Sequence, residues 1–361
     1  MIYLDYQATT PLAPEAREAM LPWLDGPDGT GFGNPHSAHR LGRQAEAAVE
    51  LARERVAALF PPGGTVVFTS GATEAINLAL RGCEPGRGGR PVAVSAIEHS
   101  AVLNTALDLP GDTTILPVDR EGLVDTQALL PDGVGIVSVM QVNNEIGTVQ
   151  PVAALFARAR AAGALFVCDA VQAAGKVPVA EADLVAISAH KFHGPKGIGA
   201  LWVRDGIELL PHTTGGGQEG GLRSGTLSPA LCAGMGEAAR LALERREADS
   251  AHVAALWERA LALFGDWTLN GSATQRWKGN LNLRRDGLDV ARLMSDVREV
   301  MFSAGSACAS ETGKPSRILG AIGLSQAEAR GSVRLGFGRY TTMAELEAAA
   351  ELINNAATQQ G

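Results

Sequence analysis

Cysteine is scarce in this chain, and no two cysteines form a recognisable pair. The 361 residues include only four cysteines, which stand far apart at Cys83, Cys168, Cys232 and Cys308. There is no CxxC pair, and no cysteine has the spacing from histidine that zinc sites show. A chain of this length builds a large core and needs no disulfides in the cytosol. We therefore predict neither a disulfide framework nor a metal site.

Clusters of positive charge and long apolar runs are also missing. The net charge is −8 and no group of lysines and arginines stands out, which disfavours nucleic acid or an anionic membrane as the main partner. No apolar run approaches the roughly 18 residues of a membrane span. Met1 is followed at once by IYLDY, which is not the layout of a signal peptide. We therefore expect a cytoplasmic protein.

Three of the four cysteines have an ordinary structural interpretation. Cys168 lies in an apolar, strand-like run and Cys232 in a helical pattern, so both are expected in the core. Cys83 is expected to be a loop thiol without a role. Cys308 lies in SAGSACAS, among small residues and glycine. It is either a thiol held out for chemistry or a small apolar residue that fills a tight corner.

Short apolar runs alternate with helical patterns through the middle of the chain. Near-continuous apolar strands separated by helices indicate a mostly parallel sheet that is covered on both faces. In such sheets, ligands bind beyond the carboxyl ends of the strands. The runs are TVVFTS (65–70), PVAVSA (91–96), TTILPV (113–118), GIVSVMQV (135–142), ALFVCDA (164–170), LVAISAH (184–190) and GALWVR (199–204).

The two ends of the chain show a different pattern. Residues 37–60 predict one long amphipathic helix, and residues 228–264 are again helical. Short strand candidates follow in GNLNLRR, VMFSAGSA and SVRLGFG, mixed with helices near 288–298 and 343–357. This mixture predicts a second, smaller α+β domain.

Polar residues follow the strand candidates at three places. After Ser70 a glycine turns the chain, and Thr73 opens a helix. The free N–H groups of a helix start, with a hydroxyl beside them, can bind an anion. The alternative is that Ser70 or Thr73 only caps the helix.

Asp169 ends the ALFVCDA run, and Gln172 follows three residues later. A carboxylate at an apolar strand end is costly unless it has a partner, so a cationic partner suits it. A structural helix cap is the alternative.

The third place is SAHKFHGPKG, where Ser188, His190 and Lys191 end a strand and Lys196 follows. A lysine in an apolar setting can have a lowered pKa and form a Schiff base. The alternative is a surface lysine whose ammonium group extends into solvent. Lys191 stands one strand–helix–strand repeat after Asp169, so both are expected in one crevice.

Together, these three places meet the requirements of pyridoxal phosphate. The lysine holds the aldehyde, the carboxylate keeps the pyridine nitrogen protonated, and the turn binds the phosphate. Each signal is weak alone, and the combination is much stronger.

Motifs along nearly the whole chain resemble those of a known family. The chain resembles the cysteine desulfurases of the class V aminotransferase family, of the NifS/IscS-like kind that supplies sulfur for iron–sulfur clusters. The motifs occur in the family's order: YLDYQATTP, GNPHSAHRLG, FTSGATEAINLA, EHSAV, VNNEIGTVQP, CDAVQAAGK, SAHKFHGPKGIGALWV, GGGQEGGLRSGT, SAGSACAS and VRLGFGRYTT.

The resemblance implies a fold and a domain division. The fold is that of a fold type I, pyridoxal phosphate-dependent transferase: α/β, with a mainly parallel seven-stranded sheet flanked by helices and a smaller α+β domain. The large cofactor-binding domain would span 14–250. The small domain would combine 1–13 with 251–361 and include the catalytic cysteine loop. That loop looks full length after Cys308, as in the long-loop group of the family.

The resemblance also implies roles around the cofactor ring. Lys191 would form the imine with the cofactor, whereas Lys196 would not. Asp169 would pair with the pyridinium nitrogen, and Gln172 would hydrogen-bond the phenolic oxygen. His99 would stack on the ring and move protons. Without the resemblance, His99 looks like a structural residue at a helix start.

Further residues would hold the phosphate and the substrate. Asn144 would contact both the cofactor and the substrate carboxylate, and Arg334 would hold that carboxylate with its bidentate fork. The alternative for Arg334 is an ion pair between domains. Thr226 would reach the phosphate from the other subunit of a homodimer. The phosphate of the same subunit would be bound by Ala72, Thr73, Ser188 and His190.

Cys308 would be the nucleophile of this family. Its thiolate would take the sulfur of L-cysteine as a persulfide, release L-alanine and pass the sulfur to an acceptor such as an iron–sulfur scaffold protein. Two departures from the family affect partners. The chain has no long C-terminal tail for docking the scaffold, and Gly220 stands where arginine is usual near the dimer interface.

Other functions remain open from the sequence. A selenocysteine lyase or another class V lyase would share Lys191, Asp169 and His99, although the SAGSAC segment favours desulfuration. An aminotransferase of this fold would not need Cys308. A protein that only binds a partner or a cofactor is disfavoured by the complete set of reactive residues.

Overall fold

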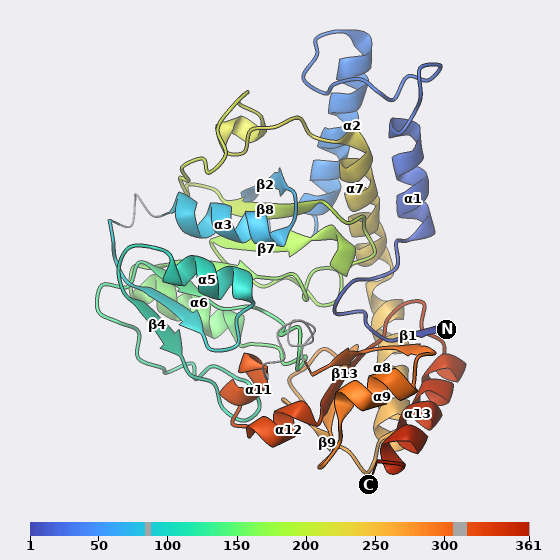
Figure 1. Ribbon diagram of the computed structural model, residues 1–361. Helices are drawn as coiled ribbons and strands as arrows, with labels where there is room; N and C mark the ends of the chain where they lie inside the picture. Colours follow the sequence, from blue (N-terminus) through green and yellow to red (C-terminus); the bar gives the residue numbers. More distant parts are fainter. Residues whose placement is uncertain (84–87, 306–315, 361) are drawn as a thin grey trace.

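A central sheet organises the larger part of the molecule. The computed structural model describes residues 1–83, 88–305 and 316–360, and within these ranges the sheet has seven strands. Each of the seven apolar runs of the sequence forms one of them (Figure 1). Side by side, the strands lie in the order β2 (Gly64–Thr69), β8 (Gly199–Arg204), β7 (Leu184–Ser188), β6 (Leu165–Asp169), β5 (Ile136–Ser138), β3 (Val92–Ser95) and β4 (Thr113–Leu116).

The sheet is mainly parallel, as predicted. The neighbours β4, β3, β5, β6 and β7 run parallel to one another, whereas β8 runs antiparallel to both β7 and β2. The reversed strand begins where its neighbours end, with Gly199 opposite Thr69 and Ser188. The start of β8 therefore belongs to the same edge of the sheet as the carboxyl ends of the parallel strands.

Helices cover both faces of the sheet, which explains why its strands are apolar throughout. Successive side chains of a strand point to opposite faces. In β2, Val66 and Phe68 belong to one buried cluster and Val67 to another. The first cluster includes residues of α2 (Arg40–Ala57), α6 (Val152–Ala161) and α7 (Pro229–Glu244). The second includes residues of α3 (Ala72–Gly82) and α5 (Ser100–Leu107).

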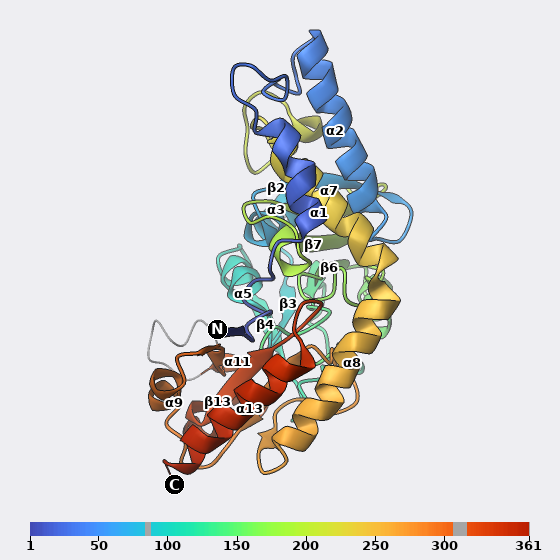
Figure 2. The same cartoon turned by 90° about the vertical axis from the view of Figure 1, so that its right-hand side faces the viewer.

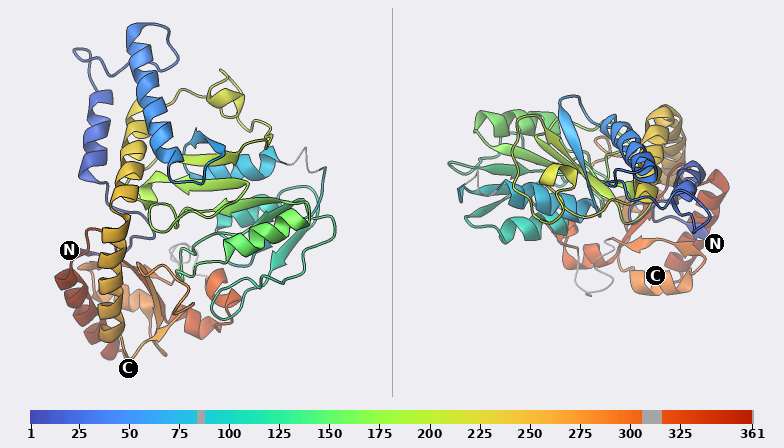
Figure 3. Two further views of the ribbon diagram at one scale, coloured as in Figure 1. Left: turned by 180° about the vertical axis from the view of Figure 1, so that it is seen from behind. Right: turned by 90° about the horizontal axis from the view of Figure 1, so that it is seen from above.

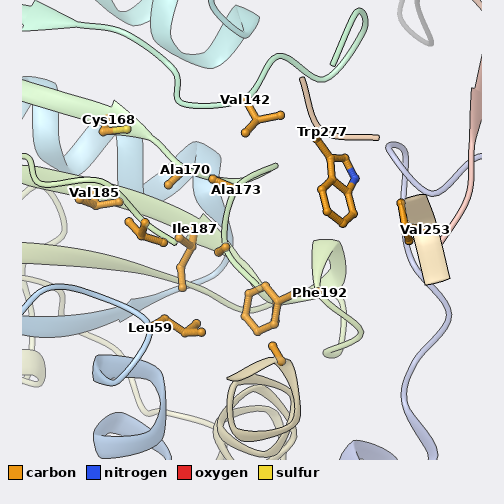
Figure 4. Close-up of a cluster of buried hydrophobic side chains, with 14 of the residues drawn as sticks. Leu59, Val142, Cys168, Ala170, Ala173, Val185, Ile187, Phe192, Val253 and Trp277 are labelled. Carbon is orange, nitrogen blue, oxygen red and sulfur yellow. The ribbon is translucent and has the colours of Figure 1, made fainter. Parts of the chain in front are cut away.

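The first cluster forms the main core and continues toward the smaller part of the molecule. Figure 4 shows Cys168 and Ile187 on the strands, with Phe192 and Trp277 further along the same cluster. Cys168 and Cys232 are fully buried, as expected of core thiols. Cys83 is also buried, so the interpretation as a loop thiol was wrong: it follows α3 directly and belongs to the second cluster.

The C-terminal part forms smaller sheets with the first residues of the chain. An antiparallel sheet has the order β12 (Ser303–Ala304), β13 (Ser332–Gly336), β10 (Asn280–Arg284) and β9 (Thr268–Leu269). Strand β1 (Ile2–Tyr3) pairs in parallel with β11 (Val300–Met301). Both termini lie at this end of the molecule (Figure 3). The remaining elements are α1 (Pro14–Met20), η1 (Leu21–Trp23), η2 (Ala189–Lys191), η3 (Glu219–Gly221), α9 (Val290–Asp296), α11 (Arg317–Ala321), α12 (Gln326–Arg330) and α13 (Met343–Thr358).

The helical pattern over 228–264 is two helices rather than one. Helix α7 ends before Arg245, which has φ −97° and ψ 0°, and α8 (Arg246–Leu263) continues in a new direction (Figure 2). Helix α8 packs against α13 in the smaller part. We propose that the domains divide as the sequence predicts, with 14–250 in one and 1–13 with 251–361 in the other. The pairing of β1 with β11 supports this division. Among the described helices, none combines the length and the apolar composition that a membrane crossing requires.

Candidate active site

The carboxyl ends of β6 and β7 bring the first candidate residues together. Asp169 is the last residue of β6, and its register partner Ala186 lies two residues before Ser188, the last residue of β7. The chain then turns through η2, which ends at Lys191. The sequence placed Asp169 and Lys191 in one crevice. Consistent with this, burial raises the pKa of Asp169, and the charge on Lys191 acts on the same carboxyl to oppose that rise.

Asp169 is a buried carboxylate that receives few hydrogen bonds. Asp169 is only 3% exposed, and its Oδ1 accepts a hydrogen bond from the Val171 N–H at 2.9 Å. Burial raises the pKa of Asp169, and the nearby His99 and Lys191 charges oppose that rise. Within the described residues Asp169 forms no salt bridge. A cationic ring nitrogen would supply the partner that this carboxylate needs.

Lys191 is held by the N-terminal segment of the chain. Its Nζ donates to the carbonyl oxygens of Gln7 at 2.6 Å and Ala8 at 2.8 Å, and the residue is half-buried. Sequence reasoning did not find this contact, because Gln7 and Lys191 are far apart along the chain. The YLDYQATTP motif contains both Gln7 and Ala8. The backbone of this segment orients the reactive amine.

Gln172 belongs to the same network. Its Nε2 donates to the Gln7 carbonyl at 2.9 Å, and its Oε1 accepts from Lys176 Nζ at 2.6 Å. Both polar atoms of the Gln172 amide are therefore engaged within the chain. Burial, together with the Lys191 charge, lowers the pKa of Lys176 to about 7. Lys176 is a second amine close to Lys191 that the sequence did not single out.

The start of α3 offers backbone donors for an anion. The helix begins after Gly71, and no side chain caps it, so the cap interpretation of Ser70 and Thr73 was wrong. Ala72 is half-buried and Thr73 is exposed. A Cβ on Gly199 would lie 2.7 Å from the Gly71 Cα, so the start of β8 closely approaches this turn. The first-turn N–H groups are therefore presented at the strand edge, as an anion site requires.

His190 and Ser188 stand beside these donors. Ser188 is buried, and His190 Nδ1 lies 3.1 Å from Thr9 Oγ1. Burial and the charges of Lys191, Lys196 and Lys176 lower the pKa of His190 to about 4. His190 is therefore neutral at neutral pH, and one ring nitrogen can still donate to an anion.

Thr226 lies on the segment between β8 and α7. Thr226 is exposed to solvent in the single chain. Three residues earlier, Arg223 Nε donates to Glu74 Oε1 at 2.7 Å, which fastens this segment to the first turn of α3. Gly220 has φ +62°, a conformation that glycine adopts without strain, and a Cβ there would meet nothing within 4 Å. An arginine at 220 would therefore be disfavoured by the backbone rather than by space.

His99 begins α5 and is exposed. Its Nδ1 accepts from the Ala101 N–H at 3.1 Å, so the ring caps the helix. In the neutral ring the proton is then on Nε2, which can donate a hydrogen bond, whereas Nδ1 can take up a proton only when it releases the Ala101 N–H. A role in proton transfer therefore requires the ring to give up the cap while it is protonated.

Asn144 and Arg334 meet at the boundary with the smaller sheets. Arg334 is 1% exposed, and its Nη1 donates to the Asn144 carbonyl at 3.1 Å. Its Nη2 donates to Asp5 Oδ1 at 2.8 Å and to Ser303 Oγ at 3.2 Å. Among the residues that the structure describes, Arg334 Nε and Asn144 Oδ1 are buried polar atoms without a hydrogen-bond partner. The ion pair with Asp5 lies within the proposed small domain, so it is not the ion pair between domains that the alternative required. The Nε–H, which has no partner among the described residues, leaves the arginine a donor for a carboxylate.

Cys308 lies outside the described residues. The chain is described up to Gly305, next to β12, and again from Ser316, which caps α11. Among the described residues there is no group of three or more histidine, cysteine or acidic side chains that could hold a metal ion.

The residues at this edge fit pyridoxal phosphate. Asp169 is a buried carboxylate with no salt bridge among the described residues, the start of α3 is uncapped, and Lys191 lies close to Asp169. These are the partners required by a pyridinium nitrogen, a phosphate and an aldehyde, respectively. The unpartnered atoms of Asn144 and Arg334 add donors and acceptors for an amino acid substrate.

Known sequences similar to this chain include proteins named as cysteine desulfurases. Residues 2–349 match the model of the aminotransferase class-V family. "Cysteine desulfurase IscS" of Rickettsia bellii is 41% identical over 372 aligned positions, which cover 98% of this chain and 90% of the relative. The protein of the same name from Colwellia psychrerythraea is also 41% identical, over 98% of this chain and 92% of its own length.

Solved structures agree with these relatives. A structure described as a NifS-like protein superposes with a TM-score of 0.91 at 29% identity and covers 99% of both chains. A structure described as SspA in complex with cysteine has a TM-score of 0.82 at 34% identity, over 95% of this chain and all of that one. The fold, the strand-edge site and these matches lead to one conclusion. The chain belongs to the aminotransferase class-V family, whose members use pyridoxal phosphate.

Proposed function

We propose that this enzyme is a cysteine desulfurase, which takes the sulfur of L-cysteine and leaves L-alanine and a persulfide on Cys308. The observation that carries the proposal is that one N-terminal segment contacts both half-sites: Gln7 and Ala8 bind Lys191, and Asp5 binds Arg334. Asp169 and Lys191 provide for the cofactor, and Arg334 with Asn144 offers polar atoms for an amino acid that have no partner among the described residues. Relatives named cysteine desulfurase share about 41% of their residues with this chain over nearly its whole length.

The residues divide the work of binding the cofactor. Pyridoxal phosphate, when bound, supplies an electron sink that makes the Cα–H of an amino acid acidic. Lys191 would hold it covalently, and Asp169 would keep its ring nitrogen protonated. The uncapped start of α3, with Ala72 and Thr73, would bind the phosphate together with Ser188 and His190.

Gln172 would act from its present position. Its amide is fixed by the Gln7 carbonyl and by Lys176. A hydrogen bond to the cofactor oxygen would therefore form in addition to these two contacts. The Lys176 amine, whose pKa burial lowers to about 7, can lose a proton near neutral pH and so adjust the charge around Lys191.

Proton movements are assigned to two side chains. The Lys191 amine, once released from the cofactor, would take the proton from the substrate Cα. It is already oriented by the carbonyls of Gln7 and Ala8. His99 would donate a hydrogen bond through Nε2 and take up a proton through Nδ1, which would then release the Ala101 N–H. The effect of the His99 charge on the Asp169 pKa supports its place beside the cofactor ring.

The sulfur transfer balances without an added oxidant. The Cys308 thiolate attacks the substrate sulfur, an S–S bond forms and the substrate C–S bond breaks. The electron pair of the C–S bond stays on the carbon, which gains a proton and becomes the methyl group of L-alanine. A free thiol has a pKa near 8.5, so a base has to take the Cys308 proton before the attack. His99 is the proposed acceptor, through Nδ1 once this atom releases the Ala101 N–H.

The assembly and the destination of the sulfur belong to the same proposal. In a homodimer, the exposed Thr226 would reach the phosphate of the partner subunit. The segment that carries it projects beyond β8 (Figure 1), and the ion pair between Arg223 and Glu74 anchors it. The persulfide would pass to an acceptor such as an iron–sulfur scaffold protein. A cytoplasmic setting is proposed because Cys168 and Cys232 are free thiols.

The test compares the wild type with Cys308→Ala in the presence of L-cysteine and a dithiol reductant. We expect the wild type to release alanine and sulfide in equal amounts. We expect Cys308→Ala to keep the visible absorbance of the bound cofactor but to lose sulfide release. Sulfide release that persists in the variant would indicate a direct lyase, such as a selenocysteine lyase. Keto acid formation that does not depend on Cys308 would indicate an aminotransferase.

A further inference from the structure

Three buried residues connect Gly305 and Ser316 to the turn that contains Asn144. Gly305 and Ser316 stand on either side of Cys308 in the chain, and they are called here the two ends of the Cys308 segment. We propose that Glu145, Asn282 and Ser316 are positioning residues for sulfur transfer. They fix the positions of Gly305 and Ser316 relative to the turn that contains Asn144. The inference rests on the proposed desulfurase function and adds to it residues with no contact to cofactor or substrate.

The C-terminal end of the segment is held at Ser316. Its Oγ donates to Glu145 Oε2 at 2.5 Å and accepts from the N–H groups of Ile318 and Leu319 at 3.1 Å. Ser316 and Glu145 are each only 8% exposed. The hydroxyl thus caps α11 and also binds a buried carboxylate. Loss of the hydroxyl would leave that carboxylate without its hydrogen bond, which is costly in a buried position.

The next residue adds a second attachment to the large sheet. The Arg317 guanidinium donates to the backbone carbonyls of Ala96 and Glu98. These carbonyls lie just before His99, the proposed proton carrier. The start of α11 is therefore fastened to the loop that leads to His99 and to the residue that follows Asn144.

The N-terminal end of the segment is held at Gly305. Its N–H donates to the Ser332 carbonyl at 2.7 Å, and its carbonyl accepts from Asn282 Nδ2 at 3.3 Å. The same Asn282 Nδ2 donates to the Glu145 carbonyl at 3.0 Å, and Asn282 is fully buried. A Cβ on Gly305 would lie 2.8 Å from Leu319 Cδ1, so this end also packs against α11. Both ends therefore converge on Glu145, one through its side chain and one through its backbone.

The turn that receives these contacts is itself rigid. Asn143 Oδ1 accepts from the N–H groups of Glu145 at 2.8 Å and Ile146 at 2.9 Å. Asn143 Nδ2 donates to the Ile97 carbonyl at 2.9 Å. The Asn144 carbonyl accepts from Arg334 Nη1. These bonds do not involve Ser316, so Asn144 and Arg334, the residues proposed to hold the substrate carboxylate, should keep their positions when the bond between Ser316 and Glu145 is lost.

The test distinguishes loss of the bond between Ser316 and Glu145 from a general loss of stability. Ser316→Ala removes the bond to Glu145 along with a helix cap. Ser325→Ala is the matched control, because Ser325 caps the neighbouring α12 and bonds to Glu328 instead. Ser316→Thr keeps the hydroxyl and should restore the wild-type behaviour. All variants are assayed as the full-length enzyme loaded with cofactor.

Two readouts are compared for each variant. One is the affinity for L-cysteine, measured from the change in the cofactor's visible spectrum. The other is the rate of persulfide formation on Cys308 in a single turnover without reductant, measured by mass spectrometry. We expect Ser316→Ala to slow persulfide formation about ten-fold, the typical effect of one buried hydrogen bond. We expect the affinity to stay within about two-fold, and both values to be unchanged in Ser325→Ala.

Other outcomes would overturn the inference. An unchanged persulfide rate in Ser316→Ala, or an equal loss in Ser325→Ala, would show that the attachment has no specific role. If Ser316→Ala loses its cofactor or its fold, Asn282→Ala is tested in its place. It must then slow persulfide formation and keep the affinity for L-cysteine. A wild-type enzyme that forms no persulfide would refute the proposed function itself, which is a distinct result.

Discussion

Arg334→Met should separate recognition of the substrate carboxylate from the rest of the chemistry. Arg334 is buried, with Nη1 and Nη2 engaged by the Asn144 carbonyl, Asp5 and Ser303, while Nε has no partner. A hydrogen bond that involves a charged group contributes about 1.5–3 kcal/mol. Loss of 2–3 kcal/mol corresponds to a fall in affinity of about 30- to 150-fold. We therefore expect that fall for L-cysteine in this variant.

The change also removes a buried ion-pair partner, so stability has to be controlled. Asp5 keeps the Ser303 hydroxyl as a donor at 3.0 Å, yet its charge loses the guanidinium at 2.8 Å. Breaking one side of a buried pair is strongly destabilising, by about 3–5 kcal/mol. The double variant Asp5→Asn/Arg334→Met removes both charges. It should recover thermal stability without recovering the affinity for L-cysteine.

Cysteamine, which is cysteine without its carboxylate, makes the assay specific. Affinities for both amines are measured from the change in the visible spectrum of the bound cofactor. The wild type should prefer L-cysteine, and in Arg334→Met this preference should fall by the same factor of about 30 to 150. A preference that survives the substitution would show that Arg334 is only a structural ion-pair residue and would refute the reasoning.

Three further predictions follow from the contacts of buried groups. Asp169→Asn should weaken cofactor retention on dialysis, because a neutral amide cannot stabilise a protonated ring nitrogen; retention equal to that of the wild type would contradict the proposed pairing. Burial raises the pKa of Glu98 from 4.5 to about 8, so the folded state binds more protons than the unfolded state between these values. The free energy of unfolding should therefore fall as pH rises through that window, by up to about 1.4 kcal/mol per pH unit. Thermal melts of Glu98→Gln should show a shallower fall with pH than those of the wild type. The same pH dependence in both proteins would argue against a raised pKa for Glu98. Gly199→Ala should weaken phosphate binding, because its Cβ would push against Gly71 at the start of α3; unchanged affinity for added pyridoxal phosphate in the apoenzyme would show that this turn is not the phosphate site.

The parallel sheet explains which parts of the site could be predicted from local sequence. Apolar strands between helices place their carboxyl ends on one edge, so Asp169 and Lys191 could be expected together. Nothing in the local sequence, however, distinguishes His99 from any other helix cap. The structure shows that it is a cap, with Nδ1 engaged by the helix. Its assignment to catalysis came from the family motif.

Contacts between distant segments could not be read from local patterns. Lys191 is oriented by Gln7 and Ala8, which precede it by 184 and 183 residues along the chain. Asp5 likewise meets Arg334 across almost the full sequence. Such pairs form only when β1 joins the C-terminal sheets, and neither periodicity nor composition encodes that step.

Turns were also hard to predict from local patterns. The helical periodicity of 228–264 continues across Arg245, where the backbone changes direction, so the pattern alone does not show that this stretch forms two helices. At α3 the small, polar residues suggested a side-chain cap, whereas the helix begins after Gly71 without one. The uncapped start favours an anion site over a purely structural turn.

The most direct measurement of the central claim is the mass of the Cys308 peptide after one turnover. The enzyme is mixed with L-cysteine without reductant, blocked with an alkylating reagent and digested. We predict that the peptide containing Cys308 gains one sulfur atom, that one alanine is released per modified subunit, and that peptides with Cys83, Cys168 and Cys232 stay unmodified. Alanine released without added sulfur on Cys308, or sulfur on another cysteine, would contradict the account.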